Sequence, residues 1–222
     1  MRQDDPPASG LLLVLVGPAG AGKTTVARGV IARAPASRAF SVSHTTRPQR
    51  PTERDGVDYW FVSRDEFEAL RAADGFAESA EVHGNLYGTS RAELERLRVA
   101  GKTAVFDIDI QGAHNLWRAY PDRTRLCFVL PPSWSVLVDR LAARGTETPD
   151  VLQRRLRTAR TELASVVASP APWHVVRNEE LSAAIEAVDA VVAAATPTPD
   201  DVAHDPAVQA FLRDACADAR AA

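Results

Sequence analysis

A glycine-rich segment directly after a short apolar run most constrains the fold of this chain. Residues 11–16 are continuously apolar, which is typical of a strand buried on both faces of a sheet. Residues 17–24 read GPAGAGKT and fit the pattern G-x-x-x-x-G-K-[ST], and a helix is predicted over about 23–34. A strand, a glycine-rich turn and a helix in this order predict a phosphate-binding loop in an α/β domain.

Each part of this loop has a role in holding a nucleoside triphosphate. Glycines allow successive backbone N–H groups to turn inward around a phosphate, and the N-terminus of the following helix adds its positive end. Lys23 is placed to reach the β- and γ-phosphates, and the Thr24 hydroxyl is a candidate ligand of Mg²⁺. We therefore expect ATP contacts at Gly17, Pro18, Ala19, Gly20, Ala21, Gly22, Lys23, Thr24 and Thr25.

Asp107 ends a second apolar run, over residues 102–108, which predicts another buried strand. In P-loop proteins a carboxylate at such a strand end holds the metal ion or its bound water. The alternative is a polar turn residue that simply follows a strand. We expect Asp107 to hold Mg²⁺ through water.

The rest of the chain alternates between apolar strands and helical patterns, which predicts a parallel sheet built from βαβ units. The Ser63-x-x-Glu66 and Ser90-x-x-Glu93 patterns are capping boxes that each open a helix. Residues 58–62 have β propensity. Further strands are predicted over 40–43, 76–82, 125–130 and 173–176, and further helices over 111–120, 133–143, 151–168 and 181–195.

Composition excludes several classes of protein. The 222 residues carry a net charge of −3, which argues against nucleic-acid binding by electrostatics alone. The longest apolar run, residues 11–16, is too short to span a membrane, and no signal peptide precedes it. Two cysteines make no disulfide framework. We expect a cytoplasmic protein without nucleic-acid or membrane partners. Among 26 basic residues only Lys23 and Lys102 are lysine, so arginine, the better bidentate phosphate ligand, dominates.

The middle of the chain carries a second set of polar groups. Residues 41–51 (SVSHTTRPQRP) place Arg47 and Arg50 among hydroxyl side chains, and Tyr59 and Tyr87 follow. Arginine forks together with hydroxyls suit a second phosphate group. The alternative is a solvated basic loop.

Three acceptor side chains, Glu78, Thr89 and Asp109, are of the kind that reads the edge of a guanine. A carboxylate accepts from both N1–H and the 2-amino group of guanine, whereas adenine has no donor at N1. These groups therefore predict a purine reader rather than a site for a plain phosphate ester.

At these residues the sequence resembles the guanylate kinase family over about residues 11–190. The matching segments are SVSHTTRPQRP (41–51), DYWFV (58–62), AEVHGNLYGTS (80–90), VFDIDIQGA (105–113), FVLPPS (128–133), RLAARGTET (140–148) and the asparagine of VVRN (175–178).

The resemblance implies a three-layer α/β P-loop kinase with a central parallel sheet and with GMP-binding and lid subdomains. It implies a kinase domain over 11–195, divided into a core (11–42, 99–135 and 169–195), a GMP-binding part (43–98) and a lid (136–168). Residues 1–10 are expected to be a flexible N-terminus. Residues 196–222 are a C-terminal extension of a linker and a helix, whose apolar stripe around Phe211 and Leu212 predicts docking on the core or on a second chain.

The resemblance also implies residue roles. The GMP phosphate would be held by Arg47, Arg50, Tyr59 and Tyr87, and the guanine by Ser43, Glu78, Thr89 and Asp109. The transferring phosphates would be met by Lys23, Arg47, Arg140, Arg144 and Arg155, and the ATP base would lie near Asn178. Thr52, Ser79 and Arg177 depart from the family pattern.

The activity implied is ATP + GMP ⇌ ADP + GDP with Mg²⁺, in purine nucleotide metabolism, by a monomer or a homodimer. Two alternatives remain. A non-catalytic interaction module of the same family typically lacks the loop lysine or the lid arginines, whereas Lys23, Arg140, Arg144 and Arg155 are present here. A sister kinase of a sugar phosphate would need no base reader such as Glu78.

Overall fold

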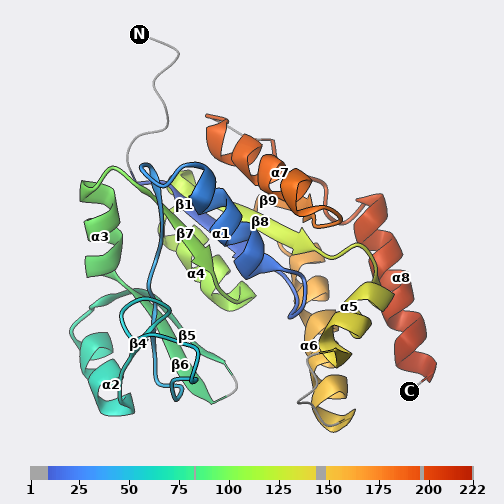
Figure 1. The fold of residues 1–222 in the computed structure, drawn as a ribbon, viewed down its shortest axis with the longest axis horizontal. Coiled ribbons are helices and arrows are strands. Elements are labelled where there is room, and N and C mark those ends of the chain that lie inside the picture. The colour runs from blue at the N-terminus through green and yellow to red at the C-terminus, as the bar shows by residue number, and fades with distance from the viewer. Residues whose placement is uncertain (1–9, 83, 144–148, 196–197, 222) are drawn as a thin grey trace.

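The computed structural model describes residues 10–82, 84–143, 149–195 and 198–221, and its centre is a five-stranded sheet (Figure 1). The strand order is β2-β7-β1-β8-β9, and every neighbouring pair is parallel. The sheet consists of β1 (Leu12–Val16), β2 (Arg38–Phe40), β7 (Thr103–Asp107), β8 (Thr124–Leu130) and β9 (Trp173–Arg177). The predicted parallel α/β sheet is confirmed.

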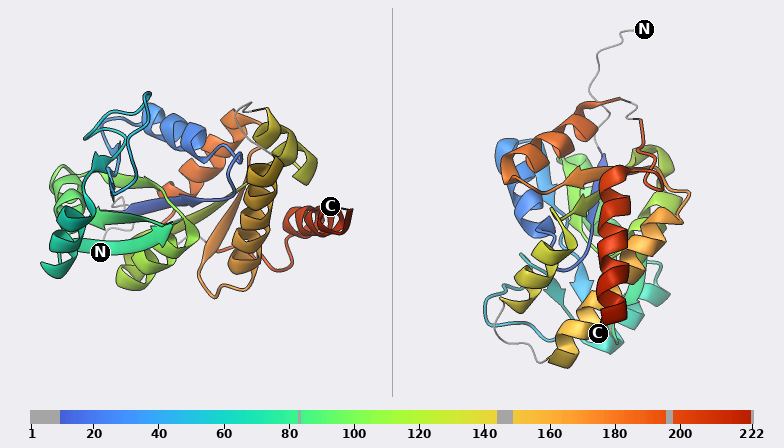
Figure 2. Two further views of the ribbon diagram at one scale, coloured as in Figure 1. Left: turned by 90° about the horizontal axis from the view of Figure 1, so that it is seen from below. Right: turned by 90° about the vertical axis from the view of Figure 1, so that its right-hand side faces the viewer.

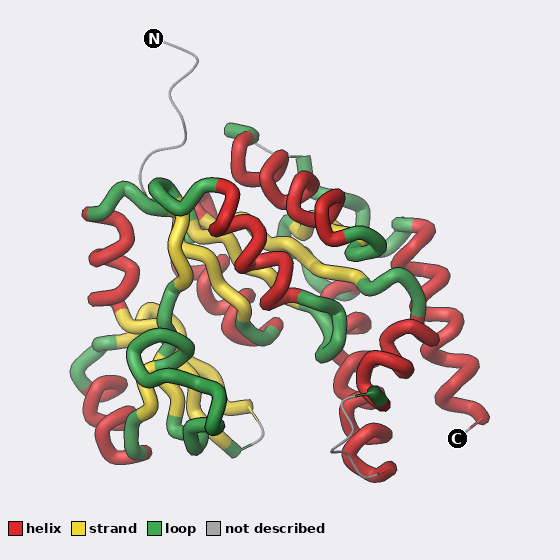
Figure 3. Tube along the Cα trace, in the orientation of Figure 1, coloured by secondary structure: helices red, strands yellow, loops and turns green. Residues whose placement is uncertain are grey.

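Helices cover both faces of this sheet, so the core has three layers (Figure 3). Along β1 successive side chains alternate between two buried clusters, as the two-residue period of a strand requires. Leu13 and Leu15 pack with Val26 and Val188 on one face, whereas Val14 and Val16 belong to the cluster on the other face. The first face is covered by α1 (Lys23–Arg33) and α7 (Leu181–Ala193), and the second by α3 (Arg91–Val99), α4 (Ile110–Ala119) and α6 (Pro149–Val167).

A second, smaller sheet lies beside the core, at the lower left of Figure 1. Its strand order is β4-β3-β6-β5, and a cluster of Phe67, Phe76 and Leu86 joins it to a helix. Its elements are β3 (His44–Thr45), β4 (Trp60–Phe61), α2 (Arg64–Ala72), β5 (Phe76–Val82) and β6 (Asn85–Ser90).

Two further helices stand on the opposite side of the molecule, next to α6 (Figure 2). They are α5 (Trp134–Ala142) and α8 (Pro206–Ala221), and a single 3₁₀ turn, η1 (Pro121–Arg123), precedes β8. Phe211 of α8 is only 3% exposed and meets Trp134 edge to face, with ring centroids 5.5 Å apart. The predicted C-terminal helix is thus present, and it docks on its own chain.

Two local predictions are wrong. The strand expected over 40–43 covers Arg38–Phe40, because it pairs with β7 from Thr103 onward. At Ser90 the capping box is only half formed: the Ser90 hydroxyl accepts from the Glu93 N–H, but the Glu93 carboxylate binds the Val42 N–H and Arg96 instead. At Ser63 both halves of the box form.

In the part of the chain that the structure describes, none of the helices has the length and apolar character needed to cross a bilayer. Of the flexible N-terminus predicted over residues 1–10, residues 1–9 lie outside the described residues, and Gly10 is buried and accepts hydrogen bonds from Arg123.

Candidate active site

The phosphate loop lies between β1 and α1, and its geometry depends on glycine. Gly22 caps α1 with φ +92°, and a Cβ at this position would lie 2.3 Å from the Asn178 side-chain nitrogen. The Asn178 side chain donates to the Ala21 carbonyl over 2.7 Å, so the residue that directly follows β9 holds the phosphate loop in place. The Lys23 ammonium donates to the Gly17 carbonyl over 2.6 Å and to Pro18 over 3.3 Å, which holds it curled over the loop.

Thr24 and Asp107, the two residues predicted to hold a metal ion, lie in contact. The Thr24 hydroxyl donates a hydrogen bond to the Asp107 carboxylate, which links the first turn of α1 to the carboxyl end of β7. A hydroxyl and a carboxylate are hard oxygen donors of the kind that Mg²⁺ prefers alongside water and phosphate oxygens. The residues present therefore fit a magnesium ion.

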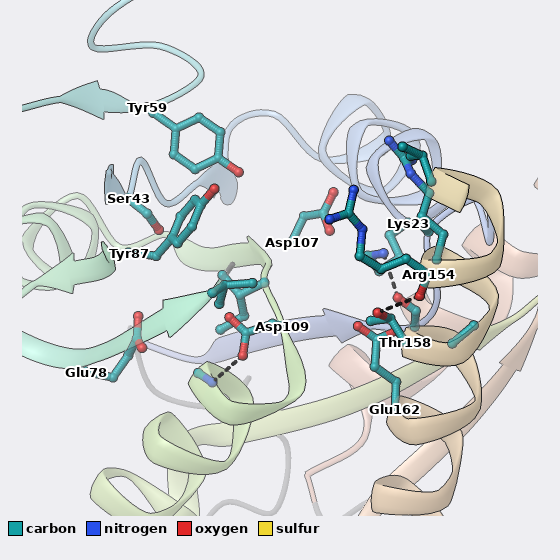
Figure 4. A pocket seen from close by; sticks show the side chains of 18 residues that line it. Lys23, Ser43, Tyr59, Glu78, Tyr87, Asp107, Asp109, Arg154, Thr158 and Glu162 are labelled. Atoms are coloured by element: carbon teal, nitrogen blue, oxygen red, sulfur yellow. Dashed lines mark hydrogen bonds between the residues drawn. The ribbon is translucent and has the colours of Figure 1, made fainter. Parts of the chain in front are cut away.

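A cavity of about 530 Å³ opens between the phosphate loop, the smaller sheet and α6 (Figure 4). This size suits a small-molecule ligand. Its lining brings together ten of the predicted site residues: Gly17, Ala19, Lys23, Ser43, Tyr59, Glu78, Tyr87, Asp107, Asp109 and Arg155.

At the end of the cavity formed by β5 and β6, Glu78 is buried, with 8% of its surface exposed. Its Oε1 accepts from the Thr89 N–H over 3.1 Å and from the Thr89 hydroxyl over 2.8 Å. Burial raises the pKa of Glu78 to about 7, and the nearby Asp109 carboxylate adds to the rise, whereas the Thr89 hydrogen bonds oppose it. Thr89 thus lies behind the carboxylate rather than in the cavity lining.

Asp109 is the N-cap of α4. Its Oδ1 accepts from the Gln111 and Gly112 N–H groups over 2.7 and 3.0 Å. One carboxylate oxygen is thereby committed to the helix, and the residue still lines the cavity beside Glu78. The cap explains why α4 begins at Ile110, one residue before the prediction.

The Arg47 guanidinium lies above the Tyr59 ring, 5.4 Å from its centroid, and the Tyr59 and Tyr87 rings meet edge to face at 6.0 Å. Burial raises the pKa of Tyr59 to about 12, so the phenol remains a hydrogen-bond donor at neutral pH. Arg47 forms a 2.8 Å ion pair with Glu53, which also accepts from the Arg50 N–H over 2.9 Å.

The described arginines that were predicted to belong to a lid lie on two helices. Arg140 of α5 donates to the Gly20 carbonyl over 3.2 Å and so contacts the phosphate loop directly. Arg155 of α6 lines the cavity, and Arg144 lies outside the described residues. The other described site residues are not part of the cavity lining: Pro18, Gly20, Ala21, Gly22, Thr24, Thr25, Arg47, Arg50, Thr89, Arg140 and Asn178. Of these, Asn178 and Arg140 donate hydrogen bonds to carbonyl groups of the phosphate loop.

Sequence reasoning missed three polar or charged residues of the cavity lining. Arg154, Thr158 and Glu162 lie one helical turn apart on α6, and all three line the cavity on the same side as Lys23 (Figure 4). Burial raises the pKa of Glu162 to about 7, against the lowering effect of the Lys23 charge. Their i, i+4, i+8 spacing marks one face of a helix and is the signal from which they were predictable. Glu53 pairs with Arg47 and Arg50 in the structure, but no spacing pattern in the sequence predicted this role.

The described geometry defines a class of protein. A glycine-rich phosphate loop at the carboxyl end of a parallel strand, with its lysine and two arginines of α6 lining one cavity large enough for a second substrate, is the arrangement of a P-loop phosphotransferase.

Comparison with known proteins gives the family. The family profile described as guanylate kinase matches residues 9–195. A guanylate kinase of Nocardia farcinica is 48% identical over 179 residues, covering 80% of this chain and 90% of its own. One from Symbiobacterium thermophilum is 43% identical, covering 83% and 85%. The crystal structure of guanylate kinase from Anaplasma phagocytophilum superposes with a TM-score of 0.66 at 30% identity, covering 84% of this chain and 86% of that one. The chain belongs to the guanylate kinase family.

Proposed function

We propose that this chain transfers the γ-phosphoryl group of ATP to the phosphate of GMP, giving ADP and GDP. The observation that carries the proposal is the composition of one cavity. It has a phosphate loop with Lys23 at one end and a buried carboxylate, Glu78, at the other. A phosphate-binding loop at one end and a group that recognises a base at the other fit two nucleotides whose phosphates meet between them.

Glu78 is the group that selects guanine. Its Oε1 is occupied by Thr89, so Oε2 is the oxygen available for donors on the base. Guanine presents N1–H and a 2-amino group, whereas adenine presents an acceptor at N1. Ser43 and Asp109, which line the cavity near Glu78, supply further polar contacts to the same base.

The GMP phosphate is received by Tyr59, Tyr87, Arg47 and Arg50. In the structure Glu53 neutralises both arginines, with its carboxylate 2.8 Å from the Arg47 guanidinium and 3.7 Å from that of Arg50. A GMP phosphate competes with Glu53 for these two guanidinium groups. Because the phosphate carries more negative charge than a carboxylate, it can displace Glu53. The Tyr59 hydroxyl, whose pKa is raised by burial, remains protonated and donates to it.

ATP lies on the phosphate loop, with its base near Asn178. The Lys23 ammonium leaves its carbonyl partners for the β- and γ-phosphates, and the inward N–H groups of the loop bind the same oxygens. Thr24, together with Asp107 through water, would hold Mg²⁺, which neutralises phosphate charge when bound.

The attacking group is an oxygen of the GMP phosphate, so no protein side chain acts as a nucleophile. The protein aligns the two phosphates and surrounds the transferring group with the Lys23, Arg140, Arg144 and Arg155 charges. We propose that residues 43–98 form the GMP-binding part and 136–168 a lid, and that closure of the lid excludes water, which otherwise hydrolyses ATP.

The proposal is tested by following phosphorus NMR signals of ATP, GMP and Mg²⁺ with the purified chain. We expect GDP and ADP to appear together in equal amounts, with little inorganic phosphate, and no turnover by Lys23→Ala. Phosphate release without GDP would identify a hydrolase and overturn the proposal.

A further inference from the structure

The C-terminal helix α8 packs against the two helices that carry the lid arginines. Val208, Phe211 and Ala215 on one face of α8 are almost completely buried, at 0%, 3% and 1% exposure. They belong to the same apolar cluster as Trp134 of α5 and Leu163 of α6. In the right-hand view of Figure 2, α8 runs alongside α6. This extension lies beyond residues 9–195, the part that matches the family.

Arg160 is the side chain that joins all three helices. It extends from α6, and its guanidinium lies over the Trp134 ring of α5 at 5.0 Å. The same guanidinium donates to the Ala215 carbonyl of α8 over 2.9 Å and forms a 2.6 Å ion pair with Asp218. One group therefore fixes α6 relative to α5 and to α8.

The beginning of the extension is attached to the core. The Asp200 N–H donates to the Trp173 carbonyl over 2.9 Å, and the Val175 N–H donates to the Asp200 carboxylate over 2.6 Å, so this segment covers the edge strand β9. Asp205 accepts from the N–H groups at the start of α8 and pairs with Arg177 over 3.3 Å. Arg177, which departs from the family pattern, thus has its partner in a segment that the family profile does not cover.

We propose that α8 is a third helix of the lid and that Arg160 is a positioning residue, which sets the orientation of α6 and hence of Arg155 toward the transferring phosphates. The cavity face and the Arg160 contacts belong to the same rigid helix, α6. Arg160 itself is not part of the cavity lining. This inference rests on the proposed function, because it assumes that Arg155 meets phosphate.

The test compares Arg160→Ala with Arg123→Ala in the full-length chain. Arg123 is a matched control, because it also donates to a carbonyl, that of Gly10 over 2.7 Å, and lies over an aromatic ring, Tyr120, at 5.6 Å. It contacts none of the lid helices in these interactions. Both variants lose comparable contacts, so both should melt at a lower temperature.

Only Arg160→Ala should change catalysis. We expect its kcat to fall about tenfold while KM for GMP stays within about twofold, since the groups that bind GMP lie on the smaller sheet, its loops and the start of α4, and none lies on α5, α6 or α8. ATP hydrolysis relative to transfer should rise, because a misplaced lid admits water. Arg123→Ala should keep the wild-type kcat at a temperature where it is folded.

Equal kcat values for the two folded variants would overturn the inference and leave GMP phosphorylation by the wild type untouched. If the wild type itself made no GDP, the proposed function would fail instead. If Arg160→Ala did not fold, Asp218→Asn, which removes one charge without changing size, would decide the same question. For Asp218→Asn the inference predicts a fall in kcat of about threefold, and a kcat equal to that of the wild type would refute it.

Discussion

Replacing Glu78 by glutamine tests whether this one carboxylate chooses the base. Glu78→Gln keeps the shape of the side chain. The amide oxygen can still accept both hydrogen bonds from Thr89, so the amide nitrogen takes the place of Oε2.

With glutamine at position 78, guanine N1–H faces a donor instead of an acceptor. Losing a hydrogen bond to a charged group costs about 1.5–3 kcal/mol, so kcat/KM for GMP should fall about 10- to 150-fold. Adenine offers an acceptor at N1, and the amide nitrogen can donate to it. The preference for GMP over AMP should therefore shrink by more than the GMP activity falls.

The pH dependence gives this prediction a second readout. The pKa of Glu78 is raised from 4.5 to about 7 by burial, and only the ionised form accepts two hydrogen bonds from guanine. For the wild type, kcat/KM for GMP should rise as the pH increases through about 7, whereas the glutamine variant should lack this step.

The stability of the folded wild type should fall over the pH range in which its kcat/KM for GMP rises. Because the folded state binds this proton more tightly than the unfolded chain, the stability supplied by neutral Glu78 is complete below pH 4.5 and is lost as the pH rises through about 7. At pH 8 Glu78→Gln, which is always neutral, should melt at a higher temperature than the wild type. The difference should shrink toward pH 4.5.

The assay is steady-state kinetics with GMP and with AMP, and with Glu81→Gln as the control. Glu81 lies on the same strand, and its side chain is exposed, so its substitution should change neither the ratio nor the pH profile. An unchanged GMP/AMP ratio of kcat/KM in Glu78→Gln would refute the reasoning. Base selection would then lie with Asp109, which lines the same cavity.

Three further substitutions test the loop. Lys23→Arg should lose activity about as fully as Lys23→Ala, at least 100-fold in kcat, because a planar guanidinium does not fit where the ammonium lies 2.6 Å from the Gly17 carbonyl; wild-type turnover would contradict this. Asp107→Asn should raise the Mg²⁺ concentration for half-maximal rate about tenfold or more, with KM for GMP unchanged, as a magnesium titration would show. Gly22→Ala should melt at a lower temperature and gain less from added ATP in a thermal shift assay, since φ is +92° and the new Cβ meets Asn178 at 2.3 Å; unchanged melting would refute the steric argument.

The elements that position the site were predictable because their signals are local. The apolar run of β1, the glycine spacing of residues 17–24 and the strand over Phe76–Val82 each depend on a few consecutive residues. The stripe around Phe211 likewise follows from helical spacing, and docking on the core was one of its two predicted outcomes.

The errors arise where distant segments compete for the same group. Glu93 completes no capping box because the Val42 N–H, 51 residues away in sequence, takes one carboxylate oxygen. The raised pKa of Glu78 could not be predicted, because it comes from burial in the folded chain. The ion pair of Glu53 with Arg47 could not be predicted either, because it depends on how their loop folds. Arg177 is unexplained until Asp205 of the extension is placed beside it.

The central claim is that one cavity phosphorylates GMP in preference to other nucleoside monophosphates. The most direct measurement is the rate of ADP release from ATP and Mg²⁺ with GMP, IMP, AMP, CMP and UMP in turn. IMP lacks the 2-amino group but keeps N1–H, so it should fall between GMP and AMP, and each lost hydrogen bond to Glu78 should cost about 10-fold or more in kcat/KM. Equal rates with AMP and GMP, or none with GMP, would contradict the account.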